Sequence, residues 1–170
     1  MSYCQYCSSL PDNDMHKRYH DEEYGVEEKN TNLLFERHSL EIFQAGLSWD
    51  IILKKRTDLR HAFNNWDLQL VSQYKNKEIE KLMRNDKIVR HRLKIESIIY
   101  NAKVILEIEQ QHKSYYHWLT QFKDKSIEDC VLIFKKKFKF VGTEIVKEFL
   151  QGICILNGAH DFDCSKYKKT

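Results

Sequence analysis

Glycine and proline are scarce, and this scarcity narrows the folds open to the chain more than any other feature. The 170 residues include five Gly and one Pro, well below the roughly 12% that these two types usually make up together. Sheet sandwiches and barrels turn back many times and use Gly and Pro at those turns. The shortage therefore predicts an all-α fold. The hydrophobic share of 42% excludes wholesale disorder.

Apolar residues recur at helical spacing. They predict a helix over about 32–45 that ends near Gly46, and a second over about 49–63 that Ser48 caps. Four further helices are marked by Ile79, Leu82 and Met83; by Leu93, Ile98, Ala102 and Ile105; by Trp118, Leu119 and Phe122; and by Ile127, Val131 and Phe134. Each stripe would face a shared core.

The last predicted helix carries Ile145, Val146, Phe149, Leu150 and Ile153 on its apolar face. We expect Thr143 to cap its start and Asn157-Gly158 to close it. No linker, repeat or low-complexity segment interrupts the chain, so residues 1–170 are expected to form one domain.

Neither a membrane span nor a signal peptide is evident. No apolar run approaches the ~20 residues that a span requires, and the first residues lack a signal-type apolar stretch. An odd number of cysteines, five, fits free thiols or metal ligands better than a disulfide framework. We therefore expect a cytoplasmic protein without membrane contact.

Cysteine and histidine concentrate at the two ends of the sequence. Zinc takes four N or S ligands in a tetrahedron, often from close pairs. The spacing allows two ligand sets. A local set would use Cys4, Cys7, His16 and His20, whereas a clasp between the termini would use Cys4, His20, His160 and Cys164. Spacing alone does not choose between them.

Basic residues form three groups that together hold half of all Lys and Arg. The groups are Lys54, Lys55, Arg56 and Arg60; Lys81, Arg84, Lys87, Arg90, Arg92 and Lys94; and Lys135, Lys136, Lys137 and Lys139. One such group is usually a solvated helix face. Three together indicate a nucleic-acid-binding surface.

Several co-linear stretches resemble one family, the bacterial 3-methyladenine DNA glycosylase I enzymes. The stretches are residues 19–26 (YHDEEYGV), 40–49 (LEIFQAGLSW), 88–92 (IVRHR) and 138–143 (FKFVGT). The resemblance spans nearly the whole chain. It implies a compact helical domain of the helix-hairpin-helix glycosylase type, with the hairpin at about 79–99 and with duplex DNA as the partner.

The resemblance also implies a structural zinc ion that joins the two termini, without any nucleotide cofactor. The family's ligand positions correspond to Cys4, His20, His160 and Cys164, which favours the clasp and leaves Cys7 and His16 outside the site. We expect a monomer, the usual state of so compact a domain.

By the same resemblance, the protein would hydrolyse the N-glycosidic bond of 3-methyladenine in alkylated DNA and leave an abasic site, without a lyase step. Glu41 matches the pocket carboxylate, Trp49 the stacking aromatic, and Tyr19 a pocket tyrosine. Tyr24 stands where the family usually has tryptophan, and Leu47 falls where the family wedges the DNA apart.

Those roles fit the chemistry. A base methylated at N3 is cationic and already activated for departure, so the enzyme must mainly extract it from the stack and hold it. Aromatic faces attract cations, and a partly desolvated carboxylate adds charge and a hydrogen bond. A leucine that inserts between base steps is a known means of unstacking DNA.

The chain departs from the family pattern at Tyr24, Ile42, Lys87 and the stretch 112–135, and the departures at Ile42 and 112–135 keep a second function open. Ile42 replaces a frequent glycine and would shrink the pocket if it faced inward, and Lys87 replaces a glycine that would be free to adopt positive φ. The stretch 112–135 is shorter than the loop that family members carry. The alternative is a catalytically weak or inactive, zinc-stabilised protein that binds alkylated DNA without excising the base.

Overall fold

The computed structural model describes residues 1–167, and every regular element in that range is a helix. In chain order the elements are α1 (Tyr3–Ser8), α2 (Met15–Glu22), α3 (Thr31–Gln44), α4 (Trp49–Ala62), the 3-10 helix η1 (Asn64–Trp66), α5 (Leu68–Ser72), α6 (Asn76–Arg84), α7 (Arg92–Gln111), α8 (Tyr115–Thr120), α9 (Ile127–Lys137) and α10 (Thr143–Gly152). The predicted all-α class is confirmed. None of the described helices is long and apolar enough to cross a bilayer.

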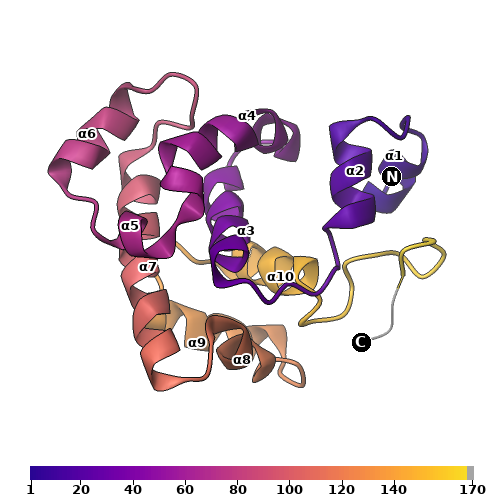
Figure 1. The fold of residues 1–170 in the computed structure, drawn as a ribbon. Coiled ribbons are helices and arrows are strands. Elements are labelled where there is room, and N and C mark those ends of the chain that lie inside the picture. Colours follow the sequence, from indigo (N-terminus) through magenta and orange to yellow (C-terminus); the bar gives the residue numbers. More distant parts are fainter. Residues whose placement is uncertain (168–170) are drawn as a thin grey trace.

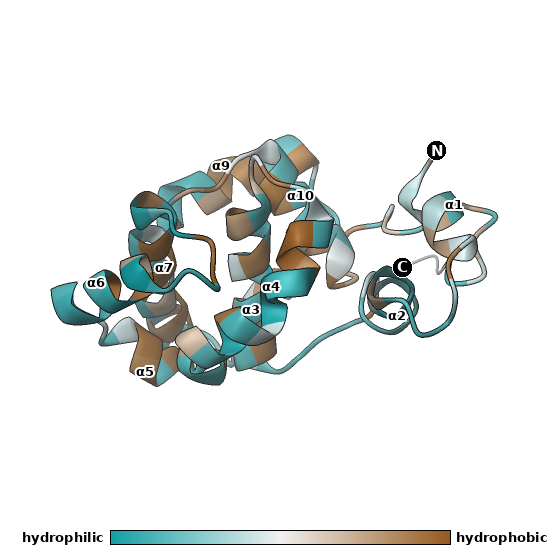
Figure 2. Cartoon of the chain, turned by 90° about the horizontal axis from the view of Figure 1, so that it is seen from above, coloured by the Kyte–Doolittle hydropathy of each residue, from teal (hydrophilic) through white to brown (hydrophobic). Residues whose placement is uncertain are grey.

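Helix α3 runs through the middle of the molecule. It contacts α4, α7 and α10, and its residues from His38 to Phe43 are buried without interruption. Apolar faces of the surrounding helices turn towards one another, as the colouring of Figure 2 shows. A helix enclosed in this way buries polar positions too, which is why Glu41 lies inside the protein.

The molecule has two parts, which we call the helical core (residues 31–152) and the terminal layer (residues 1–30 and 153–167). In Figure 1, α1, α2 and the C-terminal segment lie together beside the core. Polar contacts join the two parts. Arg37 of α3 donates to the carbonyl oxygens of Glu23, Val26 and Gly152.

Most predicted core helices are confirmed within a residue or two. The predicted helix over 32–45 is α3, and the helix over 49–63 is α4, where the Ser48 hydroxyl accepts from the Ile51 amide as expected of a cap. The helix starting at Ile127 is α9. The short helices α1, α2 and α5 were not predicted, because their apolar residues are too few to show a period.

The predicted ends of the last helix are wrong. Gly142, without a side-chain cap, precedes α10, so Thr143 is its first helical residue. The helix ends at Gly152 rather than near Asn157. After the helix, Ile153 and Ile155 still belong to the core, and the chain then continues to the Cys/His cluster described below.

Candidate active site and metal centre

A cavity of about 690 Å³ lies between the terminal layer and the helical core. Its walls come from the terminal layer, from α3 and the turn after it, from the first residue of α4, and from the start of α10. The lining residues are Tyr3, Tyr19, Tyr24, Glu41, Gln44, Ala45, Gly46, Trp49, Gly142, Thr143, Glu144, Ile145 and Glu148. Four of the five residues predicted to bind or act on the base are therefore on this wall.

Aromatic rings form one side of the cavity. The ring centroids of Tyr19 and Trp49 are 5.1 Å apart, and those of Tyr19 and Tyr24 are 5.9 Å apart. Tyr3 meets Tyr24 edge-on at 5.9 Å. These separations are within the range of favourable ring contacts, so the rings hold one another in place as a wall for a flat ligand.

Glu41 is the buried carboxyl group of the cavity, with 8% of the residue exposed. Burial raises the pKa of Glu41 to about 8, and the negative charge of Glu148 adds to the increase. Within residues 1–167, no protein group hydrogen-bonds the Glu41 carboxyl group. A strongly shifted carboxyl group in a cavity marks a candidate functional residue.

The charge of the cavity is one-sided. Three carboxyl groups, those of Glu41, Glu144 and Glu148, line it, and no lysine or arginine among the described residues does so. Negative groups and aromatic faces both favour a cation. The cavity therefore suits a flat, positively charged ligand.

Of the four departures from the family pattern, Tyr24 lines the cavity, whereas Ile42, Lys87 and the stretch 112–135 do not. Ile42 is 1% exposed within the hydrophobic core and does not line the cavity, so the expected narrowing does not occur. Lys87 is not among the described residues with positive φ, so the expected backbone strain is absent too. No residue from 112–135 lines the cavity.

Leu47, the predicted wedge, is not on the cavity wall. It follows Gly46, whose φ of 81° is in the left-handed region, and its amide donates to the carbonyl oxygen of Gln44. The side chain is half-buried and packs against the core. Its position in a turn beside the cavity leaves the role of a wedge as a prediction.

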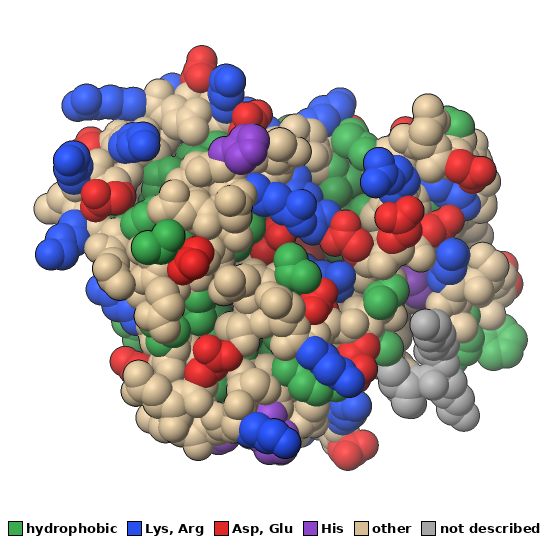
Figure 3. Space-filling view, in the orientation of Figure 1, with side chains coloured by type: hydrophobic (Ala, Val, Ile, Leu, Met, Phe, Trp, Pro, Cys, Tyr) green, Lys and Arg blue, Asp and Glu red, His purple; other side chains and the backbone are tan. Residues whose placement is uncertain are grey.

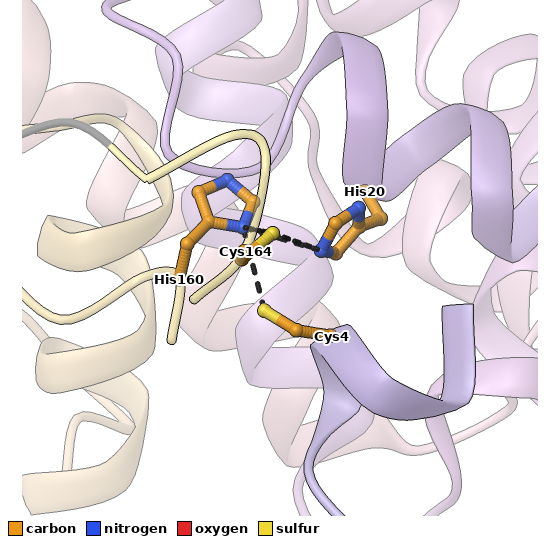
Figure 4. A group of neighbouring side chains, drawn as sticks. All are labelled: Cys4, His20, His160 and Cys164. Atoms are coloured by element: carbon orange, nitrogen blue, oxygen red, sulfur yellow. Dashed lines mark hydrogen bonds between the residues drawn. The ribbon is translucent and has the colours of Figure 1, made fainter. Parts of the chain in front are cut away.

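Cys4, His20, His160 and Cys164 converge at the terminal layer, as Figure 4 shows. Their ligand atoms all lie within 4.8 Å of one another. The Cys4 Sγ to His160 Nδ1 distance is 3.6 Å, the Cys164 Sγ to His20 Nε2 distance is 3.7 Å, and the two imidazole nitrogens are 3.2 Å apart. A tetrahedron with zinc bond lengths places its ligand atoms about 3.3–3.8 Å apart.

The outer nitrogens of both histidines have their own partners. His20 Nδ1 is 2.6 Å from the Asp21 carboxylate, and His160 Nε2 is 2.8 Å from the carbonyl oxygen of Tyr24. Each outer nitrogen must carry a proton in order to donate to the oxygen that it faces. In a neutral ring the inner nitrogen, His20 Nε2 or His160 Nδ1, therefore carries a lone pair. Two lone pairs 3.2 Å apart repel unless a cation lies between them.

Backbone amides donate hydrogen bonds to both sulfur atoms of the four-residue cluster. The Asp161 amide donates to Cys4 Sγ at 3.3 Å, and the Lys166 amide donates to Cys164 Sγ at 3.4 Å. Both amides are donors that a metal-bound sulfur can accept. The donor set therefore fits a closed, four-ligand metal site.

The local ligand set is not assembled. Cys7 Sγ lies 3.7 Å from the carbonyl oxygen of His16, and His16 Nδ1 is 3.2 Å from the Tyr3 hydroxyl. Neither side chain belongs to the four-residue cluster. The structure thus brings together the clasp ligands and leaves Cys7 and His16 outside them, as the resemblance implied.

The basic groups divide into surface and interior residues. Lys81, Arg84, Lys87, Arg90 and Arg92 are exposed on α6, α7 and the turn between them, and Figure 3 shows basic side chains projecting at the α6 end. Arg92 pairs with Glu80. This helix–turn–helix coincides with the predicted hairpin region.

Two residues of the basic groups, Lys94 and Arg56, are buried or mostly buried and are not part of an exposed face. Lys94 is 4% exposed, and its Nζ donates to the carbonyl oxygens of Phe43 (2.9 Å) and Ala45 (2.5 Å) at the end of α3. Arg56 and Arg60 bind Glu36, which is 1% exposed. Lys94 and Arg56 therefore lie mainly inside the protein, whereas the side chain of Arg60 is 42% exposed and stays a predicted surface cation.

Sequence reasoning missed Tyr3 and Glu148 on the cavity wall. Tyr3 directly precedes Cys4, a predicted metal ligand. A residue next to a fixed ligand is itself held in place, and this sequence feature could have indicated Tyr3. Glu148 lies one helical turn after Glu144 on α10. No sequence feature indicates which face of α10 meets the cavity.

Comparison with known proteins connects this geometry to an activity. A family model described as methyladenine glycosylase matches residues 9–132. DNA-3-methyladenine glycosylase 1 of Escherichia coli (strain K12) is 33% identical over 186 aligned residues, which cover 98% of this chain and 97% of the relative. DNA-3-methyladenine glycosylase of Haemophilus influenzae is 35% identical over 116 residues, covering 68% of this chain and 63% of the relative.

Solved structures agree. A 3-methyladenine DNA glycosylase I superposes with a TM-score of 0.85 at 32% identity, covering 95% of this chain and 99% of that one. A variant of such an enzyme, solved in complex with 3-methyladenine, has a TM-score of 0.86 at 29% identity, with 99% of each chain covered.

The fold and the cavity are therefore those of a helical DNA glycosylase. More narrowly, the chain belongs to the methyladenine glycosylase family.

Proposed function

We propose that this protein is a base-excision repair enzyme that hydrolyses the N-glycosidic bond of 3-methyladenine in alkylated duplex DNA. The observation that carries the proposal is the cavity itself, with aromatic rings in mutual contact, a buried carboxyl group and no cationic side chain among the described residues. It suits a planar cation, and 3-methyladenine is a planar cation while attached to DNA.

Each cavity residue has a separate task in this proposal. Trp49 and Tyr19 would stack on the extruded base, and Tyr24 would bound the cavity beside them. Glu41 would bind the polar edge of the base. Because a bound cation favours the ionised carboxylate, entry of the charged base would displace the proton that the raised pKa of Glu41 keeps in place.

Hydrolysis without a lyase step fits the same wall. A lyase reaction needs an amine nucleophile to attack the sugar, and no described lysine lines the cavity. The leaving base is already activated by its charge, so a strong general acid is not required. The product would be free base and an abasic site.

Zinc in the clasp would be structural. Four protein ligands leave no open coordination position for substrate or water, so the metal would supply the bonds that join the terminal layer and no chemistry. DNA would bind over the exposed cations of α6, α7 and their turn, where phosphate contacts position the duplex while the cavity selects the base. The protein would act as a monomer.

Glu41→Ala tests this function. Methylated duplex DNA is incubated with the native protein, and free bases are separated and quantified. We expect release of 3-methyladenine by the native protein and a loss of roughly 100-fold in the variant, since charge recognition at the reacting base is removed. Glu107→Ala, on the exposed surface of α7, is the matched control and should keep full activity.

Binding of methylated duplex without any base release would instead support the alternative of a lesion-binding protein. The two features that favoured that alternative, Ile42 and the stretch 112–135, do not reach the cavity. The structure therefore gives it no support.

A further inference from the structure

The cavity contains a second partly buried carboxylate, Glu148, that the proposed mechanism does not use. Glu148 lines the cavity from α10 and is half-buried. Its Oε2 accepts a hydrogen bond of 3.0 Å from the Tyr24 hydroxyl. This bond connects the helical core directly to the aromatic wall of the terminal layer.

The pairing explains why a tyrosine is accommodated at position 24. The family pattern has tryptophan there, whereas the phenol of Tyr24 carries a hydroxyl group that needs an acceptor when it is partly buried. Glu148 supplies that acceptor. The ring of Tyr24 is thus held from two sides, by Glu148 and by the edge of Tyr3.

Glu148 also acts on the electrostatics of the cavity. Its charge is felt at Glu41, which lies on α3. Glu144, one turn earlier on α10, is exposed and has no hydrogen bond to the aromatic wall. Of the two carboxylates on α10, Glu148 is therefore the one placed to influence a bound base.

We propose that Glu148 is a specificity-determining residue, whose carboxylate favours a positively charged base over a neutral base of the same shape and whose hydrogen bond fixes the ring of Tyr24. The inference rests on the proposed function. The hydrogen bond to Tyr24 alone would affect the binding of charged and neutral bases equally. The charge of Glu148 would favour the charged base, because an uncharged base gains little from a nearby carboxylate.

The test is Glu148→Gln, which removes the charge and keeps the shape. Two quantities are measured: kcat/KM for release of 3-methyladenine from methylated duplex, and Kd for a duplex containing 3-deaza-3-methyladenine, an uncharged isostere that is not excised. We expect kcat/KM to fall about tenfold, the size expected of one charge acting across a partly solvated cavity. The Kd of the isostere should stay within about twofold. Titration with the isostere counts the competent protein in each sample, so partial misfolding does not distort the comparison.

Three further variants separate charge from shape. Glu148→Asp keeps the charge and should preserve most of the preference for the cation. Tyr24→Phe removes the hydrogen bond and should change both quantities by the same small factor. Glu144→Gln removes an exposed charge from the same helix and should have a smaller effect than Glu148→Gln.

The outcomes are distinguishable. If the native protein releases no base, the proposed function and this inference both fail. If the native protein releases base but Glu148→Gln leaves kcat/KM unchanged, or weakens both quantities equally, only the role of Glu148 is overturned.

Discussion

The helical core and the terminal layer are held together by different kinds of interaction. In the core, large side chains such as Phe35, Phe43 and Trp66 are almost completely buried and share many contacts. The terminal layer depends on polar atoms at fixed distances: the four candidate metal ligands, the contacts of Arg37 with the carbonyl oxygens of Glu23 and Val26, and the side-chain pairs Arg56–Glu23 and Tyr24–Glu148. A substitution in the core therefore removes only a few of many contacts. A substitution in the terminal layer can remove one of the few contacts that attach this layer to the core.

The cavity takes its walls from both parts, and this is where the difference matters. Glu41 and Trp49 belong to the core, while Tyr3, Tyr19 and Tyr24 belong to the terminal layer. Each of these tyrosines is next to, or in contact with, one of the four candidate metal ligands. Tyr3 precedes Cys4, Tyr19 precedes His20, and the carbonyl oxygen of Tyr24 meets His160 Nε2. We therefore expect the metal to position the aromatic wall without touching the substrate.

Cys164→Ser should have the largest effect. Loss of one ligand should release zinc and with it on the order of 10 kcal/mol of metal-binding free energy, so that the terminal layer detaches and base release stops. The far-ultraviolet circular dichroism signal should fall only slightly, because the core helices remain. Zinc content by atomic emission, thermal melting and base release measure the three effects.

Cys7→Ser is the matched control for that change. Cys7 is fully buried, so a serine there should cost some stability, but the protein should keep one zinc ion per chain. Equal loss of zinc from both variants would show the clasp assignment to be wrong.

Glu36→Gln should have the next largest effect, because it breaks the joint between the two parts. Glu36 is 1% exposed and binds Arg56 and Arg60 at 2.8 Å each, and Arg56 also holds Glu23 of the terminal layer at 2.7 Å. Removing one partner of a buried ion pair costs about 3–5 kcal/mol. Urea unfolding measures the free energy of unfolding of the variant against the native protein.

Glu80→Gln provides the comparison for this ion pair. Glu80 pairs with Arg92 on the exposed surface of the core, and surface pairs contribute about 0–1 kcal/mol. Similar losses from Glu36→Gln and Glu80→Gln would mean that the buried network does not bear on stability as described.

Glu41→Gln should change stability in the opposite direction to the other variants, and the gain should depend on pH. The pKa of Glu41 is raised from 4.5 to about 8 in the folded protein. The protonated form of Glu41 is the one that burial favours in the folded protein. Its contribution to the free energy of unfolding is therefore fully present below about pH 4.5 and is lost as the pH rises through 8. The variant cannot ionise, so its unfolding free energy should equal that of the native protein at pH 4.5 and exceed it by at most a few kcal/mol above pH 8.

Melting curves of the two proteins from pH 4.5 to 9 measure this difference. A gap that does not change with pH would show that ionisation of Glu41 is not its cause.

Much of the core could be predicted from the sequence, because helices that bury one face repeat their apolar residues with a fixed period. The helix α3 and the Ser48 cap of α4 are examples. The terminal layer could not be predicted in this way. Helix α2 is mostly polar, and its place depends on the metal cluster and the contacts of Arg37, which join residues far apart in the chain.

The site was predicted unevenly for a related reason. A resemblance carries over residues that match a motif, such as Glu41 and Trp49, but it is silent on residues particular to this chain, such as Glu148. Lys94 shows a second limit. The sequence places Lys94 in a group of basic residues that would be expected on the surface. In the structure its ammonium group is buried, because it donates to carbonyl groups at the end of α3 that lack helical partners.

The distance in sequence between Cys4 and Cys164 also sets an order of events during synthesis of the chain. Cys4 and His20 emerge from the ribosome first, whereas His160 and Cys164 emerge only after all the core helices. Helices of the core can pair while translation continues, but the metal site and the tyrosine wall must wait. Under the proposed function, a nascent chain that stops before residue 160 would carry the exposed cations of α6 and α7, which are proposed to contact DNA, before the four-residue cluster could form.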